Sequence, residues 1–157
     1  AAALLDAKNP QRYFSLGNAY ALNGDLIRAL ETYQYAASLA PEDANTWRTL
    51  AEFCGRFGIH LNDIGIPAAQ RAVALDPKNS ASEDTLGWLW YLNEDFPSAE
   101  RHLLAALALD AQNASAHLHL GMVYMQTNDR ARALSEITLA RDLGHPQAGA
   151  LLEQLSP

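Results

Sequence analysis

Residues 10–41 read PQRYFSLGNAYALNGDLIRALETYQYAASLAP, and this stretch decides the fold. Its apolar and small residues recur every three or four positions, as on one face of a helix, in two runs that Gly24-Asp25 separates. Pro10 suits the first position of a helix, where no backbone N–H donor is needed. Pro41 closes the second run. The stretch therefore predicts two amphipathic helices joined by a short turn.

The same order of residues recurs along the chain at a period of about 34 residues. We place four repeat units at residues 10–43, 44–79, 80–113 and 114–147, and the second unit is two residues longer than the others. One column of small residues, which lets paired helices approach closely, comprises Gly17, Ala51, Gly87 and Gly121. A helix pair of this kind cannot bury its apolar face alone, so we expect the units to stack on one another.

The composition agrees with an all-α chain. The 157 residues include 29 Ala and 25 Leu, which lose little side-chain entropy in a helix. An apolar fraction of 49% with 18% charged residues excludes intrinsic disorder, and no stretch approaches the roughly 18 apolar residues of a membrane span. A net charge of −7 with only two Lys disfavours nucleic acid and anionic membranes. We therefore expect no nucleic-acid partner and no membrane insertion.

On these residues the chain resembles a tetratricopeptide-repeat (TPR) array, whose pattern is aromatic, Leu-Gly, Tyr, Ala, aromatic, Ala and Pro. The first unit matches this pattern nearly column for column. The departures, which we interpret as drift in a degenerate repeat, are Glu83 and His117 in the first aromatic column and Ala111 and His145 at the closing Pro. The resemblance implies one all-α domain, a right-handed superhelical solenoid of antiparallel helix pairs, that acts as a non-enzymatic protein–protein interaction scaffold.

Both ends of the chain extend beyond the four units. Residues 1–9 align with the last turns of a repeat's second helix, so we expect the tail of a preceding repeat and a fragment of a larger TPR protein. Residues 147–157 predict a capping helix, in which Leu151, Leu152 and Leu155 cover the last core face. A solenoid needs such a cap for solubility. The residues indicate no signal peptide and no compartment.

The second unit is the irregular one. Gly55, Gly58, Gly65 and Pro67 surround its turn and the start of its second helix. A helix that began at Asp63 would lose a hydrogen bond at Pro67, so we expect a late start or a kink there. Either a ligand-adapted loop or a tolerated insertion explains the extra residues. The insertion is favoured, because surface loops absorb added residues at little cost.

No arrangement of residues predicts catalysis. The sequence contains none of the HExxH, GxSxG, Walker or GxGxxG motifs. His117 and His119 are two residues apart, so on a helix they cannot form the i, i+4 pair of a metal site. Cys54 falls in a buried column and is interpreted as an inert core thiol. We therefore predict no enzyme activity, no catalytic residue, no metal and no cofactor.

The resemblance implies that a partner is held by positions two, five, nine, twelve and thirteen of each unit, on the face opposite the buried stripe. The partner-binding groove expected from these positions comprises Phe14, Asn18, Asn45, Arg48, Glu52, Arg56, Asp84, Trp88, Tyr91, Leu118, Met122 and Met125. Its N-terminal half is polar, and its C-terminal half is rich in aromatic residues and Met, which are typical peptide anchors. The leading hypothesis is a scaffold that binds an unidentified protein or peptide in this groove.

Two further hypotheses stay open: a structural spacer or self-association segment of a longer array, and a regulatory module of a catalytic domain outside this fragment. One specialised partner is disfavoured. TPR domains that bind chaperone C-terminal tails clamp the terminal carboxylate with Lys, Asn and Arg at defined positions. Asn18 matches one of them, whereas the others are occupied by Phe14, Thr49, Ala81 and Thr85. We therefore expect no such carboxylate clamp.

Overall fold

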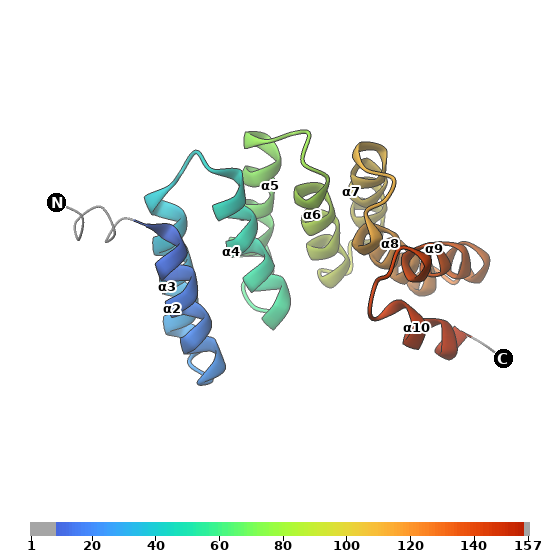
Figure 1. Ribbon diagram of the computed structural model, residues 1–157, viewed down its shortest axis with the longest axis horizontal. Helices are drawn as coiled ribbons and strands as arrows, with labels where there is room; N and C mark the ends of the chain where they lie inside the picture. The colour runs from blue at the N-terminus through green and yellow to red at the C-terminus, as the bar shows by residue number, and fades with distance from the viewer. Residues whose placement is uncertain (1–8, 156–157) are drawn as a thin grey trace. The chain divides into compact units, whose positions relative to one another are not determined.

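The computed structural model describes residues 9–155, which are predominantly helical (Figure 1) and include no strand. The helices are α2 (Pro10–Leu22), α3 (Leu26–Leu39), α4 (Ala44–Phe57), the π-helix η1 (Leu61–Gly65), α5 (Ile66–Leu75), α6 (Ser80–Leu92), α7 (Phe96–Leu109), α8 (Ala114–Gln126), α9 (Arg130–Asp142) and α10 (Ala148–Leu155). The all-α prediction is confirmed. The helix tail expected at residues 1–9 falls, apart from Asn9, outside the described residues.

The chain forms two compact structural units, each larger than one repeat: unit 1 ends at Asp76, and unit 2 begins at Pro77. In unit 1, α2 packs on α3, α3 on α4, and α4 on both η1 and α5. In unit 2, α6 packs on α7, α7 on α8, α8 on α9 and α9 on α10, while α6 also contacts α8. Within each unit, helices that follow one another in the chain therefore pack on one another. One helix pair lies within each of the four repeat ranges, whose limits stay a prediction.

An Asn or Asp caps each α-helix from α2 to α9, with the exception of α5. Its side-chain oxygen accepts a hydrogen bond from a backbone N–H in the first turn, and the capping residues are Asn9, Asp25, Asp43, Asn79, Asp95, Asn113 and Asp129. Such a cap stabilises a helix by about 1 kcal/mol. The turns inside three of the helix pairs also share a residue with positive φ, namely Gly24, Glu94 and Asn128.

Glycines in α2, α6 and α8 let each of these helices lie very close to its partner. A Cβ atom at Gly121 would stand 2.4 Å from Ile137, and real Cβ atoms essentially never come within 3.0 Å of another heavy atom. The three glycines and the side chains that they face are Gly17 with Tyr33, Gly87 with Leu103, and Gly121 with Ile137. The small residues in these three helices are therefore a packing requirement.

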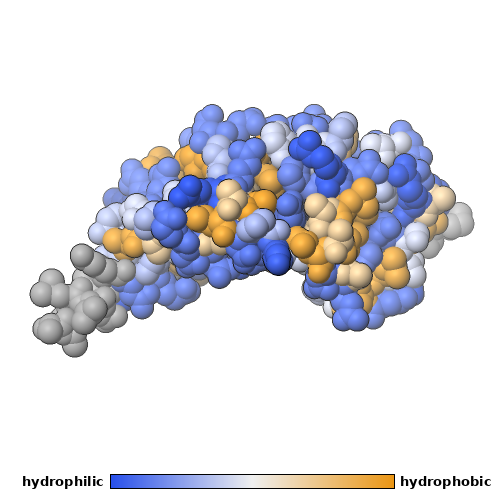
Figure 2. Space-filling model, turned by 90° about the horizontal axis from the view of Figure 1, so that it is seen from above, coloured by the Kyte–Doolittle hydropathy of each residue, from blue (hydrophilic) through white to orange (hydrophobic). Residues whose placement is uncertain are grey.

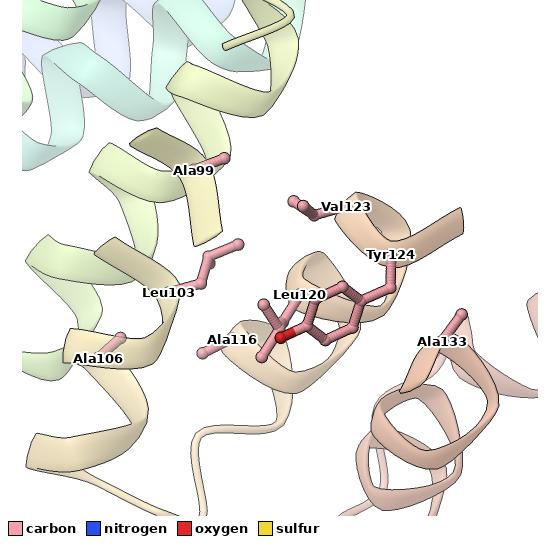
Figure 3. Packing of buried hydrophobic residues seen from close by; sticks show 8 residues of the cluster. All are labelled: Ala99, Leu103, Ala106, Ala116, Leu120, Val123, Tyr124 and Ala133. Carbon is pink, nitrogen blue, oxygen red and sulfur yellow. The ribbon is translucent and has the colours of Figure 1, made fainter. Parts of the chain in front are cut away.

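The core of unit 2 lies largely between α7 and α8. Figure 3 shows Ala99, Leu103 and Ala106 projecting from α7 toward α8, from which Ala116 and Leu120 face them. All five side chains are at most 1% exposed. The alternation of Ala with Leu lets the side chains of the two helices interdigitate. This packing explains why the sequence is rich in these two residues.

α10 covers the C-terminal end of unit 2. Its residues Leu151, Leu152 and Leu155 pack against a buried apolar cluster formed by α8, α9 and the start of α10. The buried members of this cluster are Leu118, Ile137, Ala140 and Ala148. These side chains would otherwise face water, so α10 does what a solenoid cap must do.

Two departures from the aromatic pattern form half-buried pairs between helices. His102 Nδ1 lies 2.8 Å from Glu83 Oε2, and His117 Nδ1 lies 2.6 Å from Glu136 Oε2. In both pairs the partners are 19 residues apart. The carboxylate comes first in one pair and the imidazole comes first in the other, so the two residue types have changed places between equivalent repeat positions. The substitutions in the aromatic column are therefore matched by changes in the facing helix.

The second helix pair of unit 1 differs from the others at its turn. Gly58 and His60 have positive φ, the π-helix η1 follows, and α5 begins at Ile66 with Pro67 in its first turn. The late helix start expected from Pro67 is confirmed. Cys54 in this pair is fully buried, and burial raises the pKa of its thiol to about 11. A thiol in that state is a core residue rather than a nucleophile.

The surface is mixed in polarity. Figure 2 shows a face on which hydrophobic residues gather in separate patches among hydrophilic ones. The exposed large apolar side chains include Leu22, which is 89% exposed, and Ile27, which is 75% exposed. Within residues 9–155, no helix has the length and the apolar composition needed to cross a bilayer.

Candidate functional site

Trp88 on α6 is the centre of an aromatic stack in unit 2. Its ring lies 5.0 Å from that of Tyr91, one helical turn further on, with an interplanar angle of 13°. It lies 4.4 Å from the ring of His119 on α8, at 21°. Trp88 and Tyr91 remain half-buried, so part of each ring faces solvent. Two near-parallel ring contacts hold the indole in one orientation.

His119 joins this stack to a buried carboxylate. Its Nδ1 lies 2.7 Å from Asp84 Oδ1, and Asp84 is only 8% exposed. The pKa of His145, which lies before α10, is lowered mainly by burial and, to a smaller extent, by the nearby His119. Asp84 was expected to face a partner directly. In the structure it lies beneath the stack and fixes the imidazole that supports Trp88.

Sequence reasoning missed His119, because it considered this residue only as a metal ligand. The available signal was its place in the repeat: His119 follows Asp84 by 35 residues, which is one repeat period plus one position. Equivalent faces of α6 and α8 are neighbours, since these two helices contact each other. A residue of α8 that lies one repeat position beyond the equivalent of Asp84, as His119 does, can therefore contact Asp84 on α6.

The remaining apolar residues of the predicted groove lie nearer to α10. Leu118 is 1% exposed and belongs to the cluster that α10 covers. Met122 and Met125 are half-buried and pack against the same cluster. Leu118 therefore serves the core, and the two Met side chains offer only part of their surface to a partner.

A small hollow adjoins Tyr91 at the end of α6. It has a volume of about 210 Å³ and is lined by Tyr91, Leu92, Glu94, Phe96 and Gln126. The Gln126 side-chain amide donates to the Tyr91 hydroxyl over 3.4 Å. The hollow has room for a single side chain beside the exposed edge of the stack.

In unit 1, the predicted groove residues Phe14 and Asn18 are engaged by Tyr33 of α3. Phe14 is 4% exposed and its ring centroid lies 5.2 Å from that of Tyr33. The Tyr33 hydroxyl donates to Asn18 Oδ1 over 2.8 Å. Burial raises the pKa of Tyr33, against a lowering by Arg56. Phe14 is thus a core residue, and Asn18 keeps its amide NH2 for a further acceptor.

The two groove arginines on α4 differ in their surroundings. Arg48 forms an ion pair with Glu52 and a 3.5 Å hydrogen bond with Asn45, so these three predicted residues contact one another. Arg56 is exposed, and no ion-pair partner of it occurs among residues 9–155. Of the two arginines of the predicted groove, Arg56 is therefore the one whose charge no carboxylate of the described residues neutralises.

No group of three or more His, Cys, Asp or Glu side chains with the geometry of a metal site occurs in the part of the chain that the structure describes. The half-buried His residues pair with single carboxylates instead, as His102 does with Glu83.

Comparison with known proteins assigns the class. The family model described as Tetratricopeptide repeat matches residues 10–43. A thermophilic TPR protein of Thermus thermophilus superposes with a TM-score of 0.79 at 21% identity, over 93% of this chain and 80% of that one. YrrB is described as a TPR protein with an unusual peptide-binding site. It superposes with a TM-score of 0.71 at 20% identity, over 95% of this chain and 77% of that one. The fold is that of a tetratricopeptide-repeat array, and the first helix pair matches the sequence pattern of that family.

A curated relative is the BBSome complex member BBS4 homolog of Drosophila melanogaster. It is 25% identical over 142 residues, which are 90% of this chain and 29% of that protein. The chain thus spans less than a third of the length of this relative. The fold suggests a scaffold for protein–protein interactions, and proteins built from these repeats are generally non-catalytic.

Proposed function

We propose that the protein is a scaffold that binds a peptide segment of a partner protein along the exposed face of α6 and α8, with Trp88 and Tyr91 as anchors. The observation that carries this proposal is the stack of Tyr91, Trp88 and His119 above Asp84. An aromatic anchor whose orientation is already fixed loses little conformational entropy on binding. The small hollow beside Tyr91 offers a place for a neighbouring side chain of the ligand.

The chemistry of the face favours a ligand with a large apolar or aromatic residue. Met122 is half-buried on the same helix as His119, about one turn further on, and Met side chains adapt to ligands of different shape. In unit 1, Arg56 and the free amide of Asn18 suit an acidic group or a peptide carbonyl. Arg48 is a poorer candidate, because Glu52 neutralises it.

The relatives are compatible with this role. YrrB is described as having a peptide-binding site, and the Drosophila relative is described as a member of a complex. The function of the BBS4 homolog as a whole involves much sequence outside the matched part, so only a capacity for assembly is carried over to this chain.

A random-peptide library selected on the immobilised protein tests the proposal. Peptides that share a large apolar residue should emerge, and replacing Trp88 by Ala should weaken their binding about tenfold or more. Leu104→Ala is the matched control, because Leu104 is 47% exposed on α7 of the same unit. Circular dichroism establishes that both variants fold.

Two results would contradict the proposal. Selected peptides that bind Trp88→Ala as tightly as the parent protein would exclude the stack as the anchor. A protein that selects no peptide but forms dimers in sedimentation, with Trp88→Ala monomeric, would instead support self-association through this face.

A further inference from the structure

A larger hollow lies in unit 1, on the side where the second helix pair is interrupted by η1. We call it the π-helix cleft. It has a volume of about 500 Å³, within the range of small-ligand and side-chain pockets. Its apolar lining consists of Trp47, Leu50, Ile64, Pro67 and Ala68. None of these residues belongs to the groove predicted from the repeat.

The π-helix explains why a cleft opens here. The Gly65 N–H donates to the His60 carbonyl over 2.9 Å, five residues back, so the segment is wider than an α-helix. α5 has only 10 residues, whereas α3, its counterpart in the first pair, has 14. The turn also holds His60 at φ 49°, in the left-handed region that disfavours side chains. π-helical turns of this kind occur frequently at functional sites.

A second hollow of about 390 Å³ adjoins the first. The two share Gln34 of α3 and Ile64 of η1 in their walls. The second hollow adds Leu26, Ile27 and Leu30 of α3 and Ile59. We call these two neighbouring, largely apolar hollows the trench, and each has room for one large side chain of the same ligand.

The charges around the trench are mainly acidic. Glu31 lines the second hollow, and Asp63, with its side chain 83% exposed, lines the first. Arg71 is the one Arg or Lys in the lining of either hollow, and its guanidinium lies 3.1 Å from the Glu42 carboxylate. His60 Nδ1 stands 3.9 Å from Asp63. The electrostatic potential around the opening therefore favours a cationic ligand.

We propose that the π-helix cleft and the adjoining hollow form a second binding site, for an amphipathic helical segment of a partner protein. The segment presents two apolar side chains to the trench, flanked by Lys or Arg that face Glu31 and Asp63. Helix-in-groove recognition of this kind uses apolar anchors one helical turn apart. The site lies on α3, α4, η1 and α5, and it does not depend on peptide binding at Trp88.

The test uses a fluorescein-labelled helical peptide of Leu and Lys, with Leu at i and i+4, titrated into the whole protein and followed by fluorescence anisotropy. Two further probes are a version with Glu in place of Lys and a scrambled version of the same composition. We expect the Leu/Lys helix to bind about tenfold more tightly than either of the others.

Gln34→Arg is the decisive variant, because Gln34 is exposed on α3 and lies in the wall that both hollows share. It should weaken binding of the Leu/Lys helix about tenfold or more, through bulk and charge. Gln70→Arg adds the same side chain at an exposed position of α5 outside both hollows, and it should change binding less than about twofold. Asp63→Lys should reverse the preference toward the Glu-containing helix.

The proposal is overturned if Gln34→Arg and Gln70→Arg bind the Leu/Lys helix alike, or if the scrambled peptide binds as tightly as the helix. Absence of measurable binding to the parent protein also overturns it. A concentration-dependent dimer that Gln34→Arg dissociates would assign the trench to a second copy of the chain instead.

Discussion

The imidazole of His119 stacks on the indole of Trp88 with their centroids 4.4 Å apart, although the two residues belong to different helix pairs. The same imidazole is anchored by Asp84 through Nδ1. Trp88 is therefore not a loose surface side chain. It is oriented by a neighbour whose own position depends on a carboxylate that is nearly inaccessible to water.

Replacing His119 by Ala should lower the free energy of unfolding by about 1–3 kcal/mol, because Asp84 is left buried without its partner. Asp84→Asn should cost less, since the amide oxygen still accepts a hydrogen bond from the imidazole. Urea denaturation of the two variants provides the comparison. Equal and negligible losses would show that the pair does not hold the stack in place.

Gly121→Ala should destabilise the protein by about 1–3 kcal/mol, because the new Cβ would stand 2.4 Å from Ile137 and force α8 and α9 apart. Gly149→Ala on α10 is the control, since a Cβ there meets nothing within 4 Å. The control should gain about 0.5–1 kcal/mol from better helix propensity. Thermal unfolding in which both variants shift in the same direction would contradict the packing argument.

Glu94→Gly should raise the free energy of unfolding by up to about 1 kcal/mol, because Glu94 has φ 62° in the turn between α6 and α7. The strain of about 1–2 kcal/mol that a side chain incurs there is partly offset by the greater freedom of Gly in the unfolded chain. Glu94→Ala keeps the Cβ and should bring no such gain. The midpoint of thermal unfolding distinguishes the two variants.

Two helix caps should make stability decline in acid. Hydrogen bonds from the Ser98 and Arg132 backbones, the largest cause in each case, lower the pKa of Asp95 and Asp129 below the ordinary 3.8. A depressed pKa in the folded state means that the stabilisation is complete above the unfolded pKa and is lost as pH falls through the folded one. We therefore expect the unfolding temperature to fall as the pH drops below about 4. Asp95→Asn with Asp129→Asn should flatten that slope, and an unchanged slope would exclude the caps as its cause.

The helix pairs could be predicted from the sequence because their signals are local and repeated. Gly17, Gly87 and Gly121 mark the close approaches, and Pro67 marks the late start of α5. The burial of Leu118 could not be predicted from the groove positions alone. A helical wheel assigns a residue to a face of its own helix, whereas exposure depends on the neighbour that covers that face, here α10.

The paired replacements in the aromatic column were hidden for a similar reason. Glu83 and His117 each look like an isolated departure from the pattern, and their partners lie 19 residues away in another helix. The π-helix cleft likewise depends on a backbone hydrogen bond between residues five apart. The Gly and Pro residues of this segment predict an irregular turn, but they do not predict that hydrogen bond.

The central claim, that the face of α6 and α8 binds a peptide through Trp88, is tested most directly by a ¹⁵N–¹H NMR titration with a library-selected peptide. We expect the largest shifts on the Trp88 indole N–H and on the amides of Tyr91 and His119, and we expect them to vanish in Trp88→Ala. Shifts concentrated on other helices, with the Trp88 indole signal unmoved, would contradict it.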